Sequence, residues 1–475
     1  MRHGYALGLG IAAHFCLSAA ANAGPSSGSV ANYGAVGDGV TNDTAAFNLC
    51  LTHNSICWVD PAKVYAIGDV QMKNGNRLIG LGVVEYGTQT ASTTATRPVL
   101  VAVTGATNVL DVSAVNGGAA IDGLFIDCKS TGANGISGGS FQLTIQDTTV
   151  VGCAVGFGDP TGNLYSAEAH VLNSTFGANE RGIVNPVDSF FVNVDMANNT
   201  SDGMYLGAGS NANTITNSRF EWNQGYGLQT YGGTFGNAIS NSYFDRNYKA
   251  GMRLSGVTGM SVSNSVFFRN GRNNTAPDQN AQIYMSGSKN VSITGGSSAV
   301  GRDDGGTGTY TPAHVFSYDT GAASSNVTIA GFVTGGLFNA STNPTGSFTS
   351  AVVEGTEPTS GYSVSGVNDI PETVRTVTGI TAYAGGGQAS ATPLVGTVNT
   401  VATAAAASAS VRLTSCVSGR QQTVANLGAN AIQVFGSGSN TINGVAAATG
   451  VSQAVGKIAT YTCTGGGNWT RLLSN

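Results

Sequence analysis

Charged residues are scarce in this 475-residue chain. Asp, Glu, Lys and Arg make up only 9% of it, and 25 acidic against 20 basic residues give a net charge of −5. Because there is also no basic tail, we predict no nucleic-acid partner. Sustained helical periodicity is missing as well. Short apolar pieces recur instead between glycine, of which there are 69, and asparagine, and this pattern predicts an all-β chain.

Long apolar runs are absent except at the start of the chain. Arg2 and His3 precede an apolar stretch over residues 6–17, and a small-x-small Ala-Asn-Ala pattern ends at residue 23. These features predict a signal peptide over 1–23, and therefore a secreted or periplasmic protein. No later stretch is long enough to span a bilayer, so we expect no membrane insertion.

Cysteine is also rare, and no CxxC or paired Cys/His spacing suggests zinc, so no metal site or cofactor is predicted. The predicted mature chain has six cysteines: Cys50, Cys57, Cys128, Cys153, Cys416 and Cys463. Cys50 and Cys57 are close enough to close a small disulfide loop. Cys416 and Cys463 share the C-terminal part of the chain and form a second candidate pair, although sequence alone does not fix the connectivity.

The segment over residues 32–47 reads Asn-Tyr-Gly-Ala-Val-Gly-Asp-Gly-Val-Thr-Asn-Asp-Thr-Ala-Ala-Phe. Its glycines and Asp38 suit a tight turn, and Asp43 or Thr44 suits the N-cap of a short helix. A Pro61 turn and a Leu-Ile-Gly strand over 78–80 follow.

Together these elements closely resemble the N-terminal signature of the pectate-lyase-like β-helix superfamily. That superfamily includes polygalacturonases, rhamnogalacturonases, lyases, epimerases and phage tailspike depolymerases. The resemblance implies a right-handed parallel β-helix with a polysaccharide substrate. It also makes a homotrimer possible, since tailspike-like β-helices often associate side by side. It does not select one reaction, because many chemistries share the fold.

An Asn-marked repeat occupies the middle of the chain. Five segments align on an Asn followed three residues later by a large apolar residue: Asn173–Phe176, Asn193–Met196, Asn217–Phe220, Asn241–Phe244 and Asn264–Phe267. A second Asn follows each first one after six residues: Asn179, Asn199, Asn223, Asn247 and Asn270. A period of about 20–25 residues with strand-like composition predicts a solenoid. We expect the Phe column inside and the Asn columns at coil corners, where amides bond to the next coil.

The repeat fades after about residue 300, and from about Thr373 charge nearly vanishes while Ala, Val and Thr dominate. This C-terminal part resembles the small β-sandwich modules of phage tail proteins. The predicted divisions are a signal peptide (1–23), a leader and cap (24–60), the β-helix (61–350), a linker (351–372) and a β-sandwich-like domain (373–475).

Strand alternation places the neighbours of each inward Phe on the outside. Three acids then gather on one wall: Asp195, Glu221 and Asp245. Because stacked coils are about 4.8 Å apart, the carboxyls of Glu221 and Asp245 could approach about 5 Å, as in retaining glycosidases. Those of Asp195 and Glu221 could lie roughly 8 Å apart, nearer the inverting range. These three are therefore the predicted catalytic residues, one protonating the glycosidic oxygen and another attacking or activating water.

Cations and aromatic residues accompany these acids. The predicted substrate-binding residues are Arg219, Trp222, Tyr243, Arg246, Lys249, Arg253 and Arg269. A lyase acting on a uronic-acid polymer is the runner-up, with Ca²⁺ expected only in that case. Its predicted basic residues are Arg246, Lys249, Arg253, Arg269 and Arg272. A third alternative is a non-catalytic glycan-binding or attachment protein, with the charges forming only a surface ladder of ion pairs. The Gly-His-Gly motif of polygalacturonases and the Asp-Pro-His-Glu motif of mannuronan epimerases are both absent.

Overall fold

The structure is a computed structural model of the chain. It describes residues 26–81, 97–161, 165–272, 276–299, 301, 311–312, 314–318, 324–330, 333–335, 348–354 and 376–474. The predicted signal peptide lies outside these residues, as does the predicted linker from residue 355 onward. The chain divides into two compact units, Met1–Asn368 and Asp369–Asn475.

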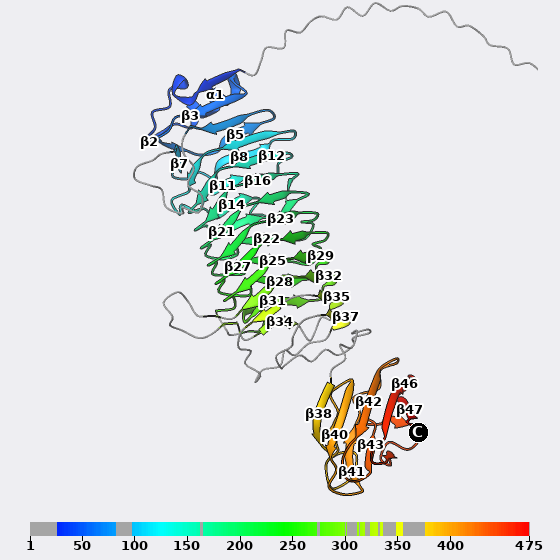
Figure 1. Cartoon of the computed structure of the whole chain (residues 1–475). Coiled ribbons are helices and arrows are strands. Elements are labelled where there is room, and N and C mark those ends of the chain that lie inside the picture. Colours follow the sequence, from blue (N-terminus) through cyan, green and yellow to red (C-terminus); the bar gives the residue numbers. More distant parts are fainter. Residues whose placement is uncertain are drawn as a thin grey trace, which may run out of the picture. The chain divides into compact units, whose positions relative to one another are not determined.

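The first unit is a stack of coils whose strands align in three parallel sheets (Figure 1). Sheet A contains β1 (Ser27–Ser29), β3 (Ile56–Val59), β6 (Arg77–Gly80), β9 (Ala119–Asp122), β12 (Leu143–Gln146), β16 (His170–Leu172), β20 (Phe190–Val192), β23 (Thr214–Thr216), β26 (Ala238–Ser240), β29 (Thr258–Ser263), β32 (Lys289–Thr294), β35 (Ser324–Ala330) and β37 (Phe348–Glu354). Sheet B contains β2 (Asp38–Asn42), β4 (Val64–Ile67), β7 (Val99–Ala102), β10 (Phe125–Asp127), β13 (Thr149–Val151), β17 (Thr175–Gly177), β21 (Asp195–Ala197), β24 (Arg219–Glu221), β27 (Tyr243–Asp245), β30 (Val266–Phe268), β33 (Ser297–Ala299) and β36 (Val333–Gly335).

Sheet C contains β5 (Val70–Lys73), β8 (Asn108–Ala114), β11 (Asn134–Ser137), β14 (Val155–Gly158), β18 (Arg181–Val184), β22 (Met204–Leu206), β25 (Leu228–Thr230), β28 (Met252–Ser255), β31 (Ala281–Ser286) and β34 (His314–Tyr318). The remaining elements are η1 (Val30–Tyr33), α1 (Thr44–His53), η2 (Pro277–Gln279), β15 (Ser166–Ala167) and β19 (Pro186–Val187). The predicted all-β parallel β-helix is therefore confirmed.

The helix expected near residue 45 is present as α1, but the side chain of Asp43 does not cap it. The Asp43 carboxylate instead accepts hydrogen bonds from the backbone N–H groups of Val36 (2.7 Å) and Gly37 (3.1 Å). Asp43 is thus buried against the preceding turn of the motif. Local sequence identified the right residue type for a cap, but the adjacent turn offered its carboxylate better donors.

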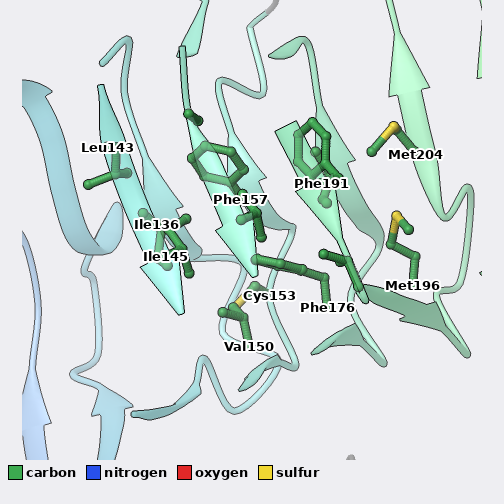
Figure 2. Close-up of a cluster of buried hydrophobic side chains, with 14 of the residues drawn as sticks. Ile136, Leu143, Ile145, Val150, Cys153, Phe157, Phe176, Phe191, Met196 and Met204 are labelled. Atoms are coloured by element: carbon green, nitrogen blue, oxygen red, sulfur yellow. The ribbon is translucent and has the colours of Figure 1, made fainter. Parts of the chain in front are cut away.

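The interior of the coils is apolar and stacked in columns. Phe157, Phe176 and Met196 point into the same interior (Figure 2). Farther along, the ring of Phe244 lies parallel to those of Phe220 and Phe267, with centroids 4.5 and 4.6 Å apart. Stacking like residues on like supplies the core that one coil alone cannot bury.

The two Asn columns occupy corners, as expected. The first column lies at exposed corners between sheets A and B in the left-handed backbone region, where Asn is tolerated; Asn217, for example, has φ 52°. The second is buried between sheets B and C and forms an amide ladder. Asn223 accepts from the backbone N–H (3.1 Å) and side chain (2.8 Å) of Asn199, and donates to Asn247 (2.8 Å).

Three disulfides are present, each within one unit. They join Cys50 to Cys57, Cys128 to Cys153 and Cys416 to Cys463. Two of them are the pairs that the sequence suggested as candidates.

The second unit is a small β domain with two sheets around one core. The first sheet contains β38 (Thr376–Thr381), β40 (Val398–Thr403), β42 (Gln421–Asn426), β46 (Ile458–Cys463), β47 (Asn468–Leu473) and β44 (Thr441–Ile442); the second contains β39 (Thr392–Pro393), β41 (Ala409–Arg412), β43 (Ile432–Phe435) and β45 (Val451–Gln453). Strands β38 to β43 alternate between the sheets and pair in parallel, and β45, β46 and β47 add antiparallel pairs. Trp469 and Tyr461 are fully buried between the sheets.

Candidate functional site

The charged wall lies on the outer face of sheet B, where four successive strands align. The central residue of each strand, from Met196 in β21 to Phe267 in β30, points into the core. The flanking residues therefore face outward. Asp195 pairs in register with Arg219 in the next coil, and Glu221 pairs with Asp245. This is the register on which the predicted site depended.

The three acids of this wall differ in their partners. Arg219 donates two hydrogen bonds to Glu221, from Nε to Oε1 (3.1 Å) and from Nη2 to Oε2 (2.7 Å). Arg269 likewise donates to both oxygens of Asp245, at 3.0 and 2.7 Å, and Arg246 adds a further contact. Bidentate contacts of this kind fix the plane of a carboxylate.

Among the described residues, no arginine forms a hydrogen bond or an ion pair with Asp195. Its side chain is buried, with 5% of the residue exposed, and its Oδ1 has no hydrogen-bond partner in the described part of the chain. Burial, assisted by the nearby charge of Glu221, raises the pKa of Asp195 to about 7, against the opposing effect of Arg219. Since burial disfavours the charged form of a carboxyl group, Asp195 is in part protonated at neutral pH.

Asp245 is buried as well, but its environment is mixed. Burial raises its pKa, while the hydrogen bonds and charge of Arg269, and the charge of Arg246, lower it. From the sequence, all three acids were candidates for catalysis. In the structure, Glu221 and Asp245 are held by arginines, whereas Asp195 is buried without such a contact among the described residues.

The predicted aromatic platforms are already in contact with cations. The guanidinium carbon of Arg246 lies 4.6 Å from the centre of the Trp222 ring, and that of Arg272 lies 5.4 Å from it. Arg219 lies 4.9 Å from the centre of the Tyr243 ring. These cation–π contacts hold the arginines of the wall in place.

Two predicted binding residues lie elsewhere. Arg253 is in β28, and Lys249 precedes that strand, so both belong to the face of sheet C, beyond the buried Asn corner. There they surround Tyr226 and lie near Asp202, a buried acid that the sequence analysis did not select. Asp202 aligns with Tyr226 one coil later. Each lies immediately before the Gly that precedes its sheet C strand, β22 or β25, and this alignment was the available signal.

Within the described ranges, no group of three or more His, Cys, Asp or Glu side chains is arranged to hold a metal ion. The same part of the chain contains no helix long and apolar enough to cross a membrane.

Comparison with known proteins addresses the fold. The family model described as "Right handed beta helix region" matches residues 181–299. Among solved structures, the A-module of the mannuronan C-5 epimerase AlgE6 from Azotobacter vinelandii is 15% identical with a TM-score of 0.50, over 72% of this chain and 96% of that module. The A-module of AlgE4 from the same organism is 17% identical with a TM-score of 0.46, over 72% and 98%. The surface adhesin PfbA of Streptococcus pneumoniae is 12% identical with a TM-score of 0.43, over 95% and 99%.

The N-terminal motif, the three parallel sheets and the match to residues 181–299 agree with one another. By fold, the chain fits the right-handed parallel β-helix superfamily.

Proposed function

We propose that this protein acts on a polysaccharide and hydrolyses glycosidic bonds, with Asp195 as the proton donor. One observation carries the proposal: Asp195 is buried, its Oδ1 has no hydrogen-bond partner within the ranges that the structure describes, and burial raises its pKa to about 7. A carboxyl group with such a pKa is in part protonated at neutral pH and can therefore serve as a general acid. Strongly perturbed acids of this kind concentrate at functional sites.

Glu221 is the proposed second carboxylate. It pairs with Ala197, two residues beyond Asp195, so the two carboxyls are separated by one coil and two residues, or roughly 8 Å. That separation leaves room for a water molecule and matches the inverting geometry. Asp195 then gives its proton to the glycosidic oxygen as the bond to the anomeric carbon breaks. Glu221 accepts a proton from the water that attacks the opposite face of that carbon.

The proposed roles for the other predicted residues follow from their contacts. Asp245, held by Arg269 and Arg246, orders the wall beside Glu221 rather than reacting. Arg219 orients Glu221 through two hydrogen bonds. Epimerisation, after which the AlgE6 module is named, is not proposed, because the Asp-Pro-His-Glu motif is absent.

The test is a panel of polysaccharides assayed for new reducing ends. Asp195→Asn is expected to lower the rate at least 100-fold, because general acid catalysis typically contributes 10²–10⁴-fold. Glu221→Gln should have a similar effect, and Asp245→Asn a smaller one. Glu180→Gln changes an exposed acid outside the wall and serves as the matched control. Full activity in Asp195→Asn would contradict the assignment.

Two other outcomes of this panel select the alternatives. Absorbance near 235 nm would mark the unsaturated product of a lyase, for which the arginines of the wall and Lys249 would be responsible. Retention of a glycan in a pull-down with unchanged chain length would mark a non-catalytic binder. The arginine-held state of Glu221 and Asp245 favours the binder as the second candidate, because both carboxylates already have cationic partners.

We further propose that the protein is exported. The three disulfides support this proposal, since such bonds persist mainly in oxidising compartments.

A further inference from the structure

The face of sheet C carries a second polar cluster that the proposed mechanism does not use. Seven of the 20 lysines and arginines lie between residues 181 and 272, and three of them belong to this face: Arg181, Lys249 and Arg253. Register aligns Tyr205, Gln229, Arg253 and Tyr284 in one outward column of successive coils. The cluster therefore extends across at least four coils.

A buried hydrogen-bonded frame lies beneath these cations. Asp202, with 3% of the residue exposed, accepts a hydrogen bond from the backbone N–H of Tyr226 (2.9 Å). The amide of Gln229, in the orientation that satisfies both of its ends, donates to Asp202 Oδ2 (2.8 Å) and accepts from Arg253 Nη1 (3.1 Å). Arg253 Nε also lies 3.5 Å from Asp278 Oδ2. The frame fixes Arg253 before any ligand arrives.

The cations rest on tyrosine rings. The guanidinium carbon of Arg181 lies 5.0 Å from the centre of the Tyr205 ring. Lys249 Nζ lies 5.0 Å from the centre of the Tyr226 ring. Within the described part of the chain, Lys249 Nζ has no hydrogen-bond or ion-pair partner. Three cations face two carboxylates, those of Asp202 and Asp278, so the cluster carries an excess of positive charge. Burial raises the pKa of Asp202, against the opposing hydrogen bond from Tyr226 and the charges of the three cations.

Tyr226, the tyrosine at the centre of this cluster, is not suited to abstract a proton. The Tyr226 hydroxyl donates to Asp278, and burial together with that hydrogen bond raises its pKa far above neutrality. Tyr226 therefore keeps its proton and is a poor base. A preformed frame with cations and aromatic rings suits a ligand that combines a negative group with a flat apolar face.

We infer that the sheet C cluster is a binding site for an anionic sugar residue, one that carries a carboxylate or a sulfate group. The inference rests on the proposal that the substrate is a polysaccharide. It adds a second site on sheet C, separated from Asp195 on sheet B by the buried Asn ladder. Lys249 and Arg181 contact the anionic group, while Arg253 orders the site through Gln229 and Asp278.

The experiment measures binding by calorimetry on the full chain, using oligosaccharides of matched length in three forms: neutral, carboxylated and sulfated. We expect an anionic form to bind at least tenfold more tightly than the neutral form, and the carboxylated and sulfated arms identify the group. Lys249→Gln should weaken that binding about tenfold, since one charge-assisted contact is lost. Lys289→Gln, an exposed lysine on sheet A, should leave it unchanged.

Equal affinity for all three forms, or unchanged anionic binding in both Lys249→Gln and Arg181→Gln, would overturn the inference. Cleavage is assayed in parallel in the wild type and in Asp195→Asn, so that failure of the binding site and failure of the proposed hydrolysis can be distinguished. A chain that binds anionic sugar through Lys249 but never cleaves supports the site and contradicts the mechanism. Cleavage that is unaffected by Lys249→Gln and Arg181→Gln, together with equal binding of the three forms, contradicts the site and leaves the mechanism standing.

Discussion

Asp195 couples the stability of the chain to pH at the scale of a single residue. Its pKa is about 7 in the folded chain, against an ordinary value of 3.8. Between these two values the folded chain holds a proton that the unfolded chain has released. The contribution of Asp195 to the free energy of unfolding is therefore fully present below about pH 4, and it is lost as the pH rises to about 7. At about 1.4 kcal/mol per pKa unit, the loss has an upper limit of ~4 kcal/mol.

Urea unfolding at pH 4.5 and pH 7.5 measures this loss. The wild-type chain should lose more unfolding free energy between these values than Asp195→Asn, which cannot titrate. Other buried acids such as Asp202 contribute equally to both chains, so the difference isolates Asp195. Identical losses in the two chains would contradict the raised pKa.

At the same scale, alternation in the sequence predicted which residues face outward but not how much water reaches them. Asp195, Glu221 and Asp245 occupy similar outward positions, yet Asp195 and Asp245 are buried while Glu221 is half-buried. Which acid pairs with which arginine depends on side-chain reach between coils, as with Arg269 and Asp245. A one-dimensional pattern does not contain that information.

At the scale of the element, the buried Asn ladder makes each corner depend on its neighbours. Asn223 donates to Met196 O (2.9 Å) and to Asn247, and it accepts two hydrogen bonds from Asn199. Asn223→Ala removes all four and leaves buried polar groups unpaired. We expect it to lower the unfolding free energy by about 2–4 kcal/mol, measured by urea denaturation.

Asn217→Gly is the matched control for that substitution. Asn217 lies at an exposed corner with φ 52°, a conformation that Gly adopts without strain. Asn217→Gly should therefore lower the unfolding free energy by less than about 1 kcal/mol. Equal destabilisation by the two substitutions would show that the ladder contributes nothing beyond ordinary corner geometry.

The strands and corners of the coils were predictable because the repeat combines strand alternation with two Asn positions. Alternation decides which side chains face the core, and the Asn positions mark the corners. The inward Phe column and both corners follow from this repeat. The cluster on sheet C was not predictable in the same way. Lys249 and Arg253 are close in sequence to Asp245, but a corner intervenes and turns them onto another face.

At the scale of the whole molecule, a change in composition and the resemblance to small β-sandwich modules predicted a second β domain from residue 373 onward. The parallel pairing of β38, β40 and β42 within it was not predictable, because its strands carry no Asn-marked repeat. The division into Met1–Asn368 and Asp369–Asn475 has a thermodynamic consequence, since each unit has its own buried core. Two independent cores predict two unfolding transitions.

The three tryptophans of the chain can distinguish those transitions. Trp469 is fully buried in the second unit, whereas Trp58 and Trp222 belong to the first. In a chain carrying Trp58→Phe and Trp222→Phe, fluorescence reports only the second unit; in Trp469→Phe it reports only the first. We expect different thermal midpoints in the two chains, each matching one calorimetric peak. Because Trp469→Phe loosens only the second core, the midpoint reported by Trp58 and Trp222 should equal the first-unit peak of the wild type. A single shared midpoint that moves with Trp469→Phe would instead mean that the two cores unfold as one cooperative unit.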